Sequence, residues 1–139
     1  MAVFNKFNSF VEALAEGTHN LGSNTLKVML TNSAPLSTNT IKANLTEITS
    51  GNGYTSGGHV LTVTSSSQAL GVYKLIVNNI VITASGGSIG PFRYAVVYND
   101  TAASDELIGY YDYESSLTLA SGEIFTIYFD ATNGLISLT

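Results

Sequence analysis

Histidine and serine are the first residues of this sequence that could do chemistry. His19 or His59 could act as a general base, with one of the many serines as the nucleophile. The sequence has no Gly-x-Ser-x-Gly motif, however, and a catalytic triad is defined by geometry rather than by position in the chain. We therefore expect His19 to bond the last carbonyl groups of a helix or to be exposed, and His59 to lie on the surface where a strand begins.

Five acidic side chains within fifteen positions offer a second kind of chemistry. They are Asp100, Asp105, Glu106, Asp112 and Glu114. Paired carboxylates can act as acid and base in glycoside hydrolysis, or bind Ca²⁺. The spacing matches neither an EF-hand nor a calcium-binding repeat, and a solvated acidic loop needs no ligand. We therefore expect no catalytic residue, no metal site and no cofactor, and we expect that the protein is not an enzyme.

Tyrosines offer a third possibility, because aromatic rings can stack on sugars. Strict alternation along residues 107–113 places Tyr111 and Tyr113 on one face of a strand, and Tyr110 with Asp112 on the other. One face of such a strand is ordinarily core, and tyrosine can lie at its edge with the hydroxyl in water. Glycan contact through Tyr110, Tyr111, Asp112 and Tyr113 is the alternative binding function.

The charge balance argues against nucleic acid as a partner. The formal net charge is −5, and Arg93 is the single arginine. The lysines are scattered, so no basic stripe could neutralise phosphates. The chain has no cysteine, which excludes disulfides and thiolate metal sites and fits synthesis in the cytoplasm. Its start does not resemble a signal peptide, and no apolar run reaches about 18 residues, so we expect no membrane contact.

The first residues have the period of a helix. Apolar side chains recur there at spacings of three and one, which predicts an amphipathic helix over 3–16 that ends at Gly17. Its apolar stripe consists of Phe4, Phe7, Phe10, Val11 and Leu14. The stripe either covers one end of the protein's own core or docks on another subunit, and it is the candidate interface.

From residue 26 onward the apolar period changes to two. Leu26, Val28 and Leu30 alternate with more polar residues, and further short runs are separated by glycine, asparagine and serine clusters. The predicted strands are 26–31, 59–65, 71–77, 79–84, 92–98, 107–113, 116–119, 123–130 and 135–138. Residues 36–50 are expected to form a loop or an irregular edge, and Asn78-Asn79 a tight turn. This pattern predicts a single domain over 1–139, mainly β, as an antiparallel sandwich, jelly roll or barrel.

Six segments form an ordered set that covers most of the chain. They are 10–21 (FVEALAEGTHNL), 25–32 (TLKVMLTN), 53–58 (GYTSGG), 93–100 (RYAVVYND), 107–110 (LIGY) and 125–135 (FTIYFDATNGL). Together they resemble a family of small structural virion proteins of tailed bacteriophages. The sequence departs from the family pattern mainly at 36–50 and 62–90.

The resemblance implies a capsid decoration, or cement, protein with a jelly-roll-like β-sandwich and one short N-terminal helix. The implied partner is the major capsid protein, with a homo-oligomer, a dimer or trimer, on the outer surface of the virion after synthesis in the bacterial host cytoplasm. The family has no catalytic residue to transfer. The aromatic stripe would then contact the capsid or a neighbouring copy. The alternative is a glycan-binding module associated with a tail or head fibre.

Overall fold

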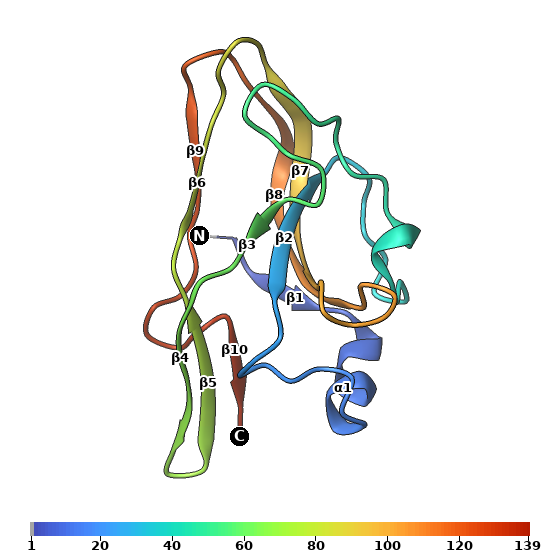
Figure 1. Ribbon diagram of the computed structural model, residues 1–139, viewed down its shortest axis with the longest axis vertical. Coiled ribbons are helices and arrows are strands. Elements are labelled where there is room, and N and C mark those ends of the chain that lie inside the picture. The colour runs from blue at the N-terminus through green and yellow to red at the C-terminus, as the bar shows by residue number, and fades with distance from the viewer. Residues whose placement is uncertain (1) are drawn as a thin grey trace.

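Antiparallel strands make up most of the regular structure in the computed structural model, which describes residues 2–139 (Figure 1). The elements are β1 (Phe4–Lys6), α1 (Asn8–Ala15), β2 (Leu26–Thr31), the 3₁₀ helix η1 (Lys42–Asn44), β3 (His59–Val60), β4 (Val63–Ala69), β5 (Val72–Val77), β6 (Ile80–Thr83), β7 (Ile89–Asn99), β8 (Leu107–Leu119), β9 (Ile124–Ile127) and β10 (Ile136–Leu138). The predicted mainly β fold with one short helix is confirmed. The jelly-roll connectivity stays a prediction.

The strands form two layers. One layer is a five-stranded sheet of order β1-β8-β7-β2-β3. The other consists of a three-stranded sheet of order β10-β5-β4 and the β6-β9 pair, which lie one beyond the other opposite the large sheet (Figure 1). All strand pairs are antiparallel. This is the arrangement of a β-sandwich, in which apolar side chains from facing sheets fill the space between the layers.

The inner core lies between these layers. Val28 and Leu30 of β2 are almost completely buried there, as the period of two predicts. Residues from both layers contribute, including Ala95, Val97 and Ile108 from the large sheet and Leu75, Val77, Ile82 and Ile127 from the smaller ones. Burial of such side chains is the main favourable contribution to folding.

The opposite face of the large sheet is covered as well. Met29 of β2 and Tyr98 of β7 are buried on this face, although simple alternation would expose them. They belong to an outer cluster with Phe7, Tyr94, Val96 and Leu107. Figure 1 shows the long connection between β2 and β3, with η1, on this side of the sheet. The central strands are therefore buried on both faces, and the 36–50 region is part of the cover.

Glu47 holds this long connection in place. Its Oε1 atom accepts hydrogen bonds from the Tyr54 hydroxyl at 2.6 Å and from the Gly57 N–H at 2.7 Å. The Tyr54 hydroxyl also accepts a bond from the Leu30 N–H of β2 at 2.9 Å. Burial, followed by the hydrogen bond to Glu47, raises the pKa of Tyr54, so this hydroxyl keeps its proton. Lys42 lies 3.5 Å from the second Glu47 oxygen and completes the network.

Replacing Glu47 with alanine is expected to lower the free energy of unfolding by about 1–3 kcal/mol, because the buried Tyr54 hydroxyl and the partly buried Gly57 N–H lose their acceptor. Denaturant unfolding measures the change, and proteolysis of residues 32–58 should become faster. Glu16→Ala is the matched control, since Glu16 is exposed, and its effect is expected to stay within about 0.5 kcal/mol. Equal effects of the two substitutions would show that the network does not anchor this segment.

Several predicted boundaries are wrong. The helix does not cover 3–16: residues 4–6 form β1, which pairs with β8, and α1 begins at Asn8. The stretch 59–65 is divided between β3 in the large sheet and β4 in the small one. Asn78-Asn79 is not a hairpin turn, because β5 and β6 belong to different sheets. The separate strands predicted at 107–113 and 116–119 are one strand, β8.

Candidate interaction surface

The N-terminal stripe is divided between the interior and the surface. Phe7 is completely buried in the outer cluster, where its ring centroid lies 5.3 Å from that of Tyr110. Phe10 is buried in the inner core, with its centroid 5.5 Å from that of His19. These two side chains are covered by their own chain. The expectation that the five residues share one helix face is wrong, because Phe4 lies in β1 and Phe7 precedes α1. Phe7 and Phe10 follow the alternative in which the stripe covers the protein's own core.

Local sequence explains this division. The chain is extended at Phe7, the residue that precedes α1, so the side chains before and after it point in directions that a continuous helix would not give. Gly17 ends α1 as predicted, with a φ of 84°. The Thr18 N–H bonds the Ala13 carbonyl at 2.8 Å and the Gly17 N–H bonds the Leu14 carbonyl at 3.3 Å, which is the Schellman arrangement.

The other three stripe residues line an apolar groove. Phe4 and Leu14 are partly buried, and Val11 is 52% exposed. The groove has a volume of about 330 Å³, and its far wall is residues 135–138. We call this feature the α1–β10 groove; it is lined by Phe4, Lys6, Phe10, Val11, Leu14, Leu135, Ile136, Ser137 and Leu138. β1 and β10 are the end strands of their sheets, so two sheet edges border the groove.

The tyrosines of β8 pack on both faces of the large sheet, and the predicted alternation is confirmed. Tyr111 is 4% exposed in the inner core, and Tyr113 packs against the same core. Tyr110 packs on the outer cluster. Burial raises the pKa of Tyr113 to about 12 and also raises the pKa of Tyr111. Tyr111 is therefore not accessible to a sugar ring, and the four residues predicted for glycan contact do not form one surface.

Asp112 is bound by Arg93 from the neighbouring strand β7. The Arg93 Nε and Nη2 atoms donate to the two Asp112 oxygens at 2.8 and 3.1 Å. This hydrogen-bonded pairing, helped by the Glu114 N–H, lowers the pKa of the Asp112 carboxyl. A carboxyl group with a lowered pKa is poorly suited to act as a general acid.

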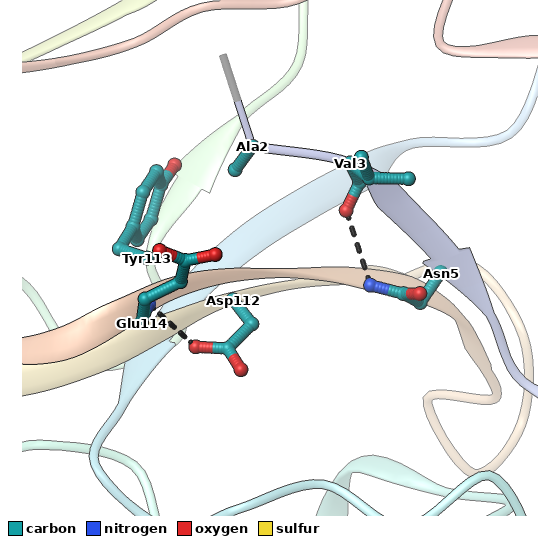
Figure 2. Close-up of a pocket in the computed structure, with 6 residues that line it drawn as sticks. All are labelled: Ala2, Val3, Asn5, Asp112, Tyr113 and Glu114. Atoms are coloured by element: carbon teal, nitrogen blue, oxygen red, sulfur yellow. Dashed lines mark hydrogen bonds between the residues drawn. The ribbon is translucent and has the colours of Figure 1, made fainter.

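A polar pocket lies beside this ion pair. Figure 2 shows Asp112, Tyr113 and Glu114 of β8 across from Ala2, Val3 and Asn5. Its volume is about 440 Å³. Asn5 is turned toward its own backbone, where its amide donates to the Val3 carbonyl at 3.1 Å. The other predicted acidic residues lie elsewhere, and Asp100 pairs with Lys27 at 3.3 Å. Within residues 2–139 no three acidic or histidine side chains gather as a metal site.

His19 is buried, contrary to expectation. It is 5% exposed, and its Nδ1 atom is 3.0 Å from the Asn99 amide nitrogen. Asn99 also donates to the Asn24 side-chain oxygen at 2.8 Å, so its amide group acts as the donor to His19 and fixes the neutral form with the proton on Nε2. Burial lowers the pKa of His19, and the charge of Glu106 opposes this only in part. His59 is half-buried rather than exposed, beside the Tyr54 ring.

The protein is expected to lose stability as the pH falls from about 7 to 5. The unfolded chain takes up a proton on His19 near pH 6.5, whereas the folded protein does so only at lower pH, so folding becomes less favourable between these values. His59 contributes in the same direction. Unfolding measured at several pH values should show a smaller loss for His19→Gln, with His59→Gln as the matched comparison. An unchanged pH dependence in both variants would contradict this account.

The β4–β5 hairpin is the feature that the sequence analysis missed. Ala69 pairs with Val72, so Leu70 and Gly71 form a two-residue turn in which both residues have positive φ, 52° and 81°. Leu70 is fully exposed. In Figure 1 the hairpin ends at the lower tip of the molecule. Gly71 is the one residue of this turn that such turns favour, and β4 lacks an apolar alternation, so the sequence pattern gives little indication of the hairpin.

Comparisons of the chain with protein-family models, curated proteins and solved structures find no match. No helix in the described part of the chain is both long and apolar enough to cross a membrane.

Proposed function

We propose that the protein is a decoration protein, bound to the major capsid protein on the outer surface of a tailed bacteriophage head, where it stabilises the shell. The family resemblance supports this proposal. Three of its segments, 25–32, 93–100 and 107–110, fall on β2, β7 and β8, which are neighbours in the large sheet. The other three segments lie on α1 and the turn after it, in the β2–β3 connection, and on β9 and the chain that follows it, so the resemblance reaches both layers. The departures at 36–50 and 62–90 include part of the β2–β3 connection and the strands β4, β5 and β6.

The observation that carries the proposal is the neutral free edge formed by β4. This strand is an end strand of its sheet, and most of its residues are exposed. No Asp, Glu, Lys or Arg occurs between Glu47 and Lys74. The serine and threonine hydroxyls of this strand bond within the chain, to the Ile76 carbonyl, to one another and to the Tyr73 hydroxyl. Their remaining lone pairs can accept hydrogen bonds from a partner without the cost of burying ions. An exposed strand edge can also pair with a strand of another chain.

A decoration protein needs only modest affinity per copy. Many copies bind one shell, and a ligand that binds the assembled state but not the separated subunits shifts the equilibrium toward assembly. An uncharged strand edge is better suited to such static contacts than to catalysis. The β4 edge replaces the N-terminal stripe as the proposed capsid contact, since Phe7 and Phe10 are buried in their own chain.

The test uses phage heads from which the protein has been removed. Heads should open at a lower temperature without it and recover when the purified protein is added back. Ser67→Glu places a charge on the exposed β4 edge and is expected to abolish the recovery, whereas Ala103→Glu, in the exposed loop after β7, should preserve it. Heads whose heat stability does not depend on the protein would refute the proposal.

A further inference from the structure

Leu70 is an unfavourable residue for an isolated hairpin tip. Two-residue turns with positive φ at both positions favour asparagine, aspartate or glycine, because a side chain such as leucine is strained there. At 103% relative exposure, Leu70 also gains nothing from burial within its own chain. A residue that contradicts both the turn geometry and the hydrophobic pattern points to a contact outside the chain.

The α1–β10 groove is an apolar site on the same protein that could accept the Leu70 side chain. Its walls are apolar side chains from α1, β1 and residues 135–138, and Lys6 is its one charged lining residue. Within residues 2–139, Lys6 makes no ion pair. The groove is therefore suited to an apolar, uncharged segment with oxygen acceptors that could bond the Lys6 ammonium.

The hairpin tip has this chemistry. It lies in the run between Glu47 and Lys74 that contains no charged residue, whereas the whole chain carries a net charge of −5. Two copies therefore repel each other least where the tip of one approaches the other. The backbone carbonyls of the turn supply neutral acceptors for Lys6, and the Gln68 amide oxygen, which already accepts from the Gly71 N–H at 3.1 Å, has a second lone pair.

The tip and the groove also lie at the same end of the molecule. Leu138 of β10, which lines the groove, pairs with Tyr73 of β5, only two residues from Gly71 in the turn. Figure 1 shows the hairpin, β10 and α1 together at the lower end. A two-fold axis at this end would bring each tip to the groove of the other copy.

We propose that the protein forms a two-fold symmetric dimer in which the Leu70 tip of each copy occupies the α1–β10 groove of the other. Stable interfaces bury about 800 Å² per partner, more than a single tip supplies. The reciprocal arrangement doubles the contact area without a second kind of surface. This dimer uses the tip and leaves the β4 edge open, and it does not depend on the capsid role.

Sedimentation of the purified protein over a range of concentrations tests the dimer. Leu70→Asn is expected to weaken dimerisation about a hundredfold, because two leucine contacts are lost per dimer, while asparagine suits the turn and keeps the monomer folded. Leu36→Asn is the matched control, since Leu36 is also exposed, at 62%, and should leave the dimer unchanged. A wild-type protein that stays monomeric, or a dimer unaffected by Leu70→Asn, would overturn the proposal.

Disulfide trapping tests the geometry, because the chain has no cysteine of its own. A Leu70→Cys protein mixed with a size-tagged Ser137→Cys protein should give the mixed disulfide under mild oxidation. The same mixture with Ala103→Cys in place of Ser137→Cys should not. Equal trapping in both mixtures would contradict tip-in-groove contact. A monomeric wild type whose binding to phage heads is lost in Leu70→Asn would show that the tip contacts the capsid instead, and would likewise refute the dimer.

Discussion

Replacing Phe10 with alanine is expected to lower the free energy of unfolding by about 3–5 kcal/mol, the usual cost of removing a buried phenylalanine. Phe10 is 4% exposed and joins α1 to the inner core beside His19. Its loss leaves a cavity that the two sheets cannot close without moving. Chemical unfolding followed by fluorescence or circular dichroism measures this change.

Val11 is the matched control on the same helix. Its side chain is 52% exposed, and alanine is a better helix former, so Val11→Ala in dilute protein is expected to change stability by no more than about 0.5 kcal/mol. If Phe10→Ala were as mild as Val11→Ala, the aromatic stripe would not be part of the core. The alternative in which these side chains dock on another subunit would then be the better description.

Gly58→Ala is the second substitution with a large expected effect, about 3 kcal/mol or more. Gly58 has a φ of 82°, and a Cβ atom there would overlap the carbonyl oxygen of Val28 in β2. The close approach lets the long connection return along β2 and enter β3, which pairs with the same strand. Alanine would force this segment away from the large sheet and weaken the cover of the outer cluster.

Gly17→Ala is the control that separates the overlap of a Cβ atom with its neighbours from the cost of a side chain at positive φ. Its φ of 84° is nearly the same, but no atom lies within 4 Å of the position that a Cβ would take. Gly17→Ala should therefore cost only the left-handed conformation, about 1–2 kcal/mol. Thermal unfolding of the two variants makes the comparison, and equal losses would show that the contact with Val28 is unimportant.

Alternation made the centre of the large sheet predictable. Leu26, Val28 and Leu30 point into the inner core as their spacing indicates, and the turn clusters lie close to most strand ends. The same pattern did not indicate that Met29 and Tyr98 are buried. Their burial depends on a distant loop that covers the outer face, and local spacing contains no information about such a cover.

The N-terminal error has a similar cause. Spacings of three between Phe4, Phe7 and Phe10 fit a helix, but Phe4 pairs with Tyr111 across a sheet edge, and this long-range pairing outweighs local periodicity. The glycan hypothesis depended on four neighbouring residues, whereas their accessibility is decided by what packs on each face of β8. The groove required the three-dimensional arrangement, because its walls come from both ends of the chain.

The number of copies in a purified virion tests the central claim most directly. Quantitative mass spectrometry of particles from the phage or prophage that encodes this chain would supply this number, with the major capsid protein as the internal standard. A decoration protein should be present in hundreds of copies, and removing it should leave the capsid protein in place. Absence from the particle, or a handful of copies as expected for a tail tip, would contradict the account.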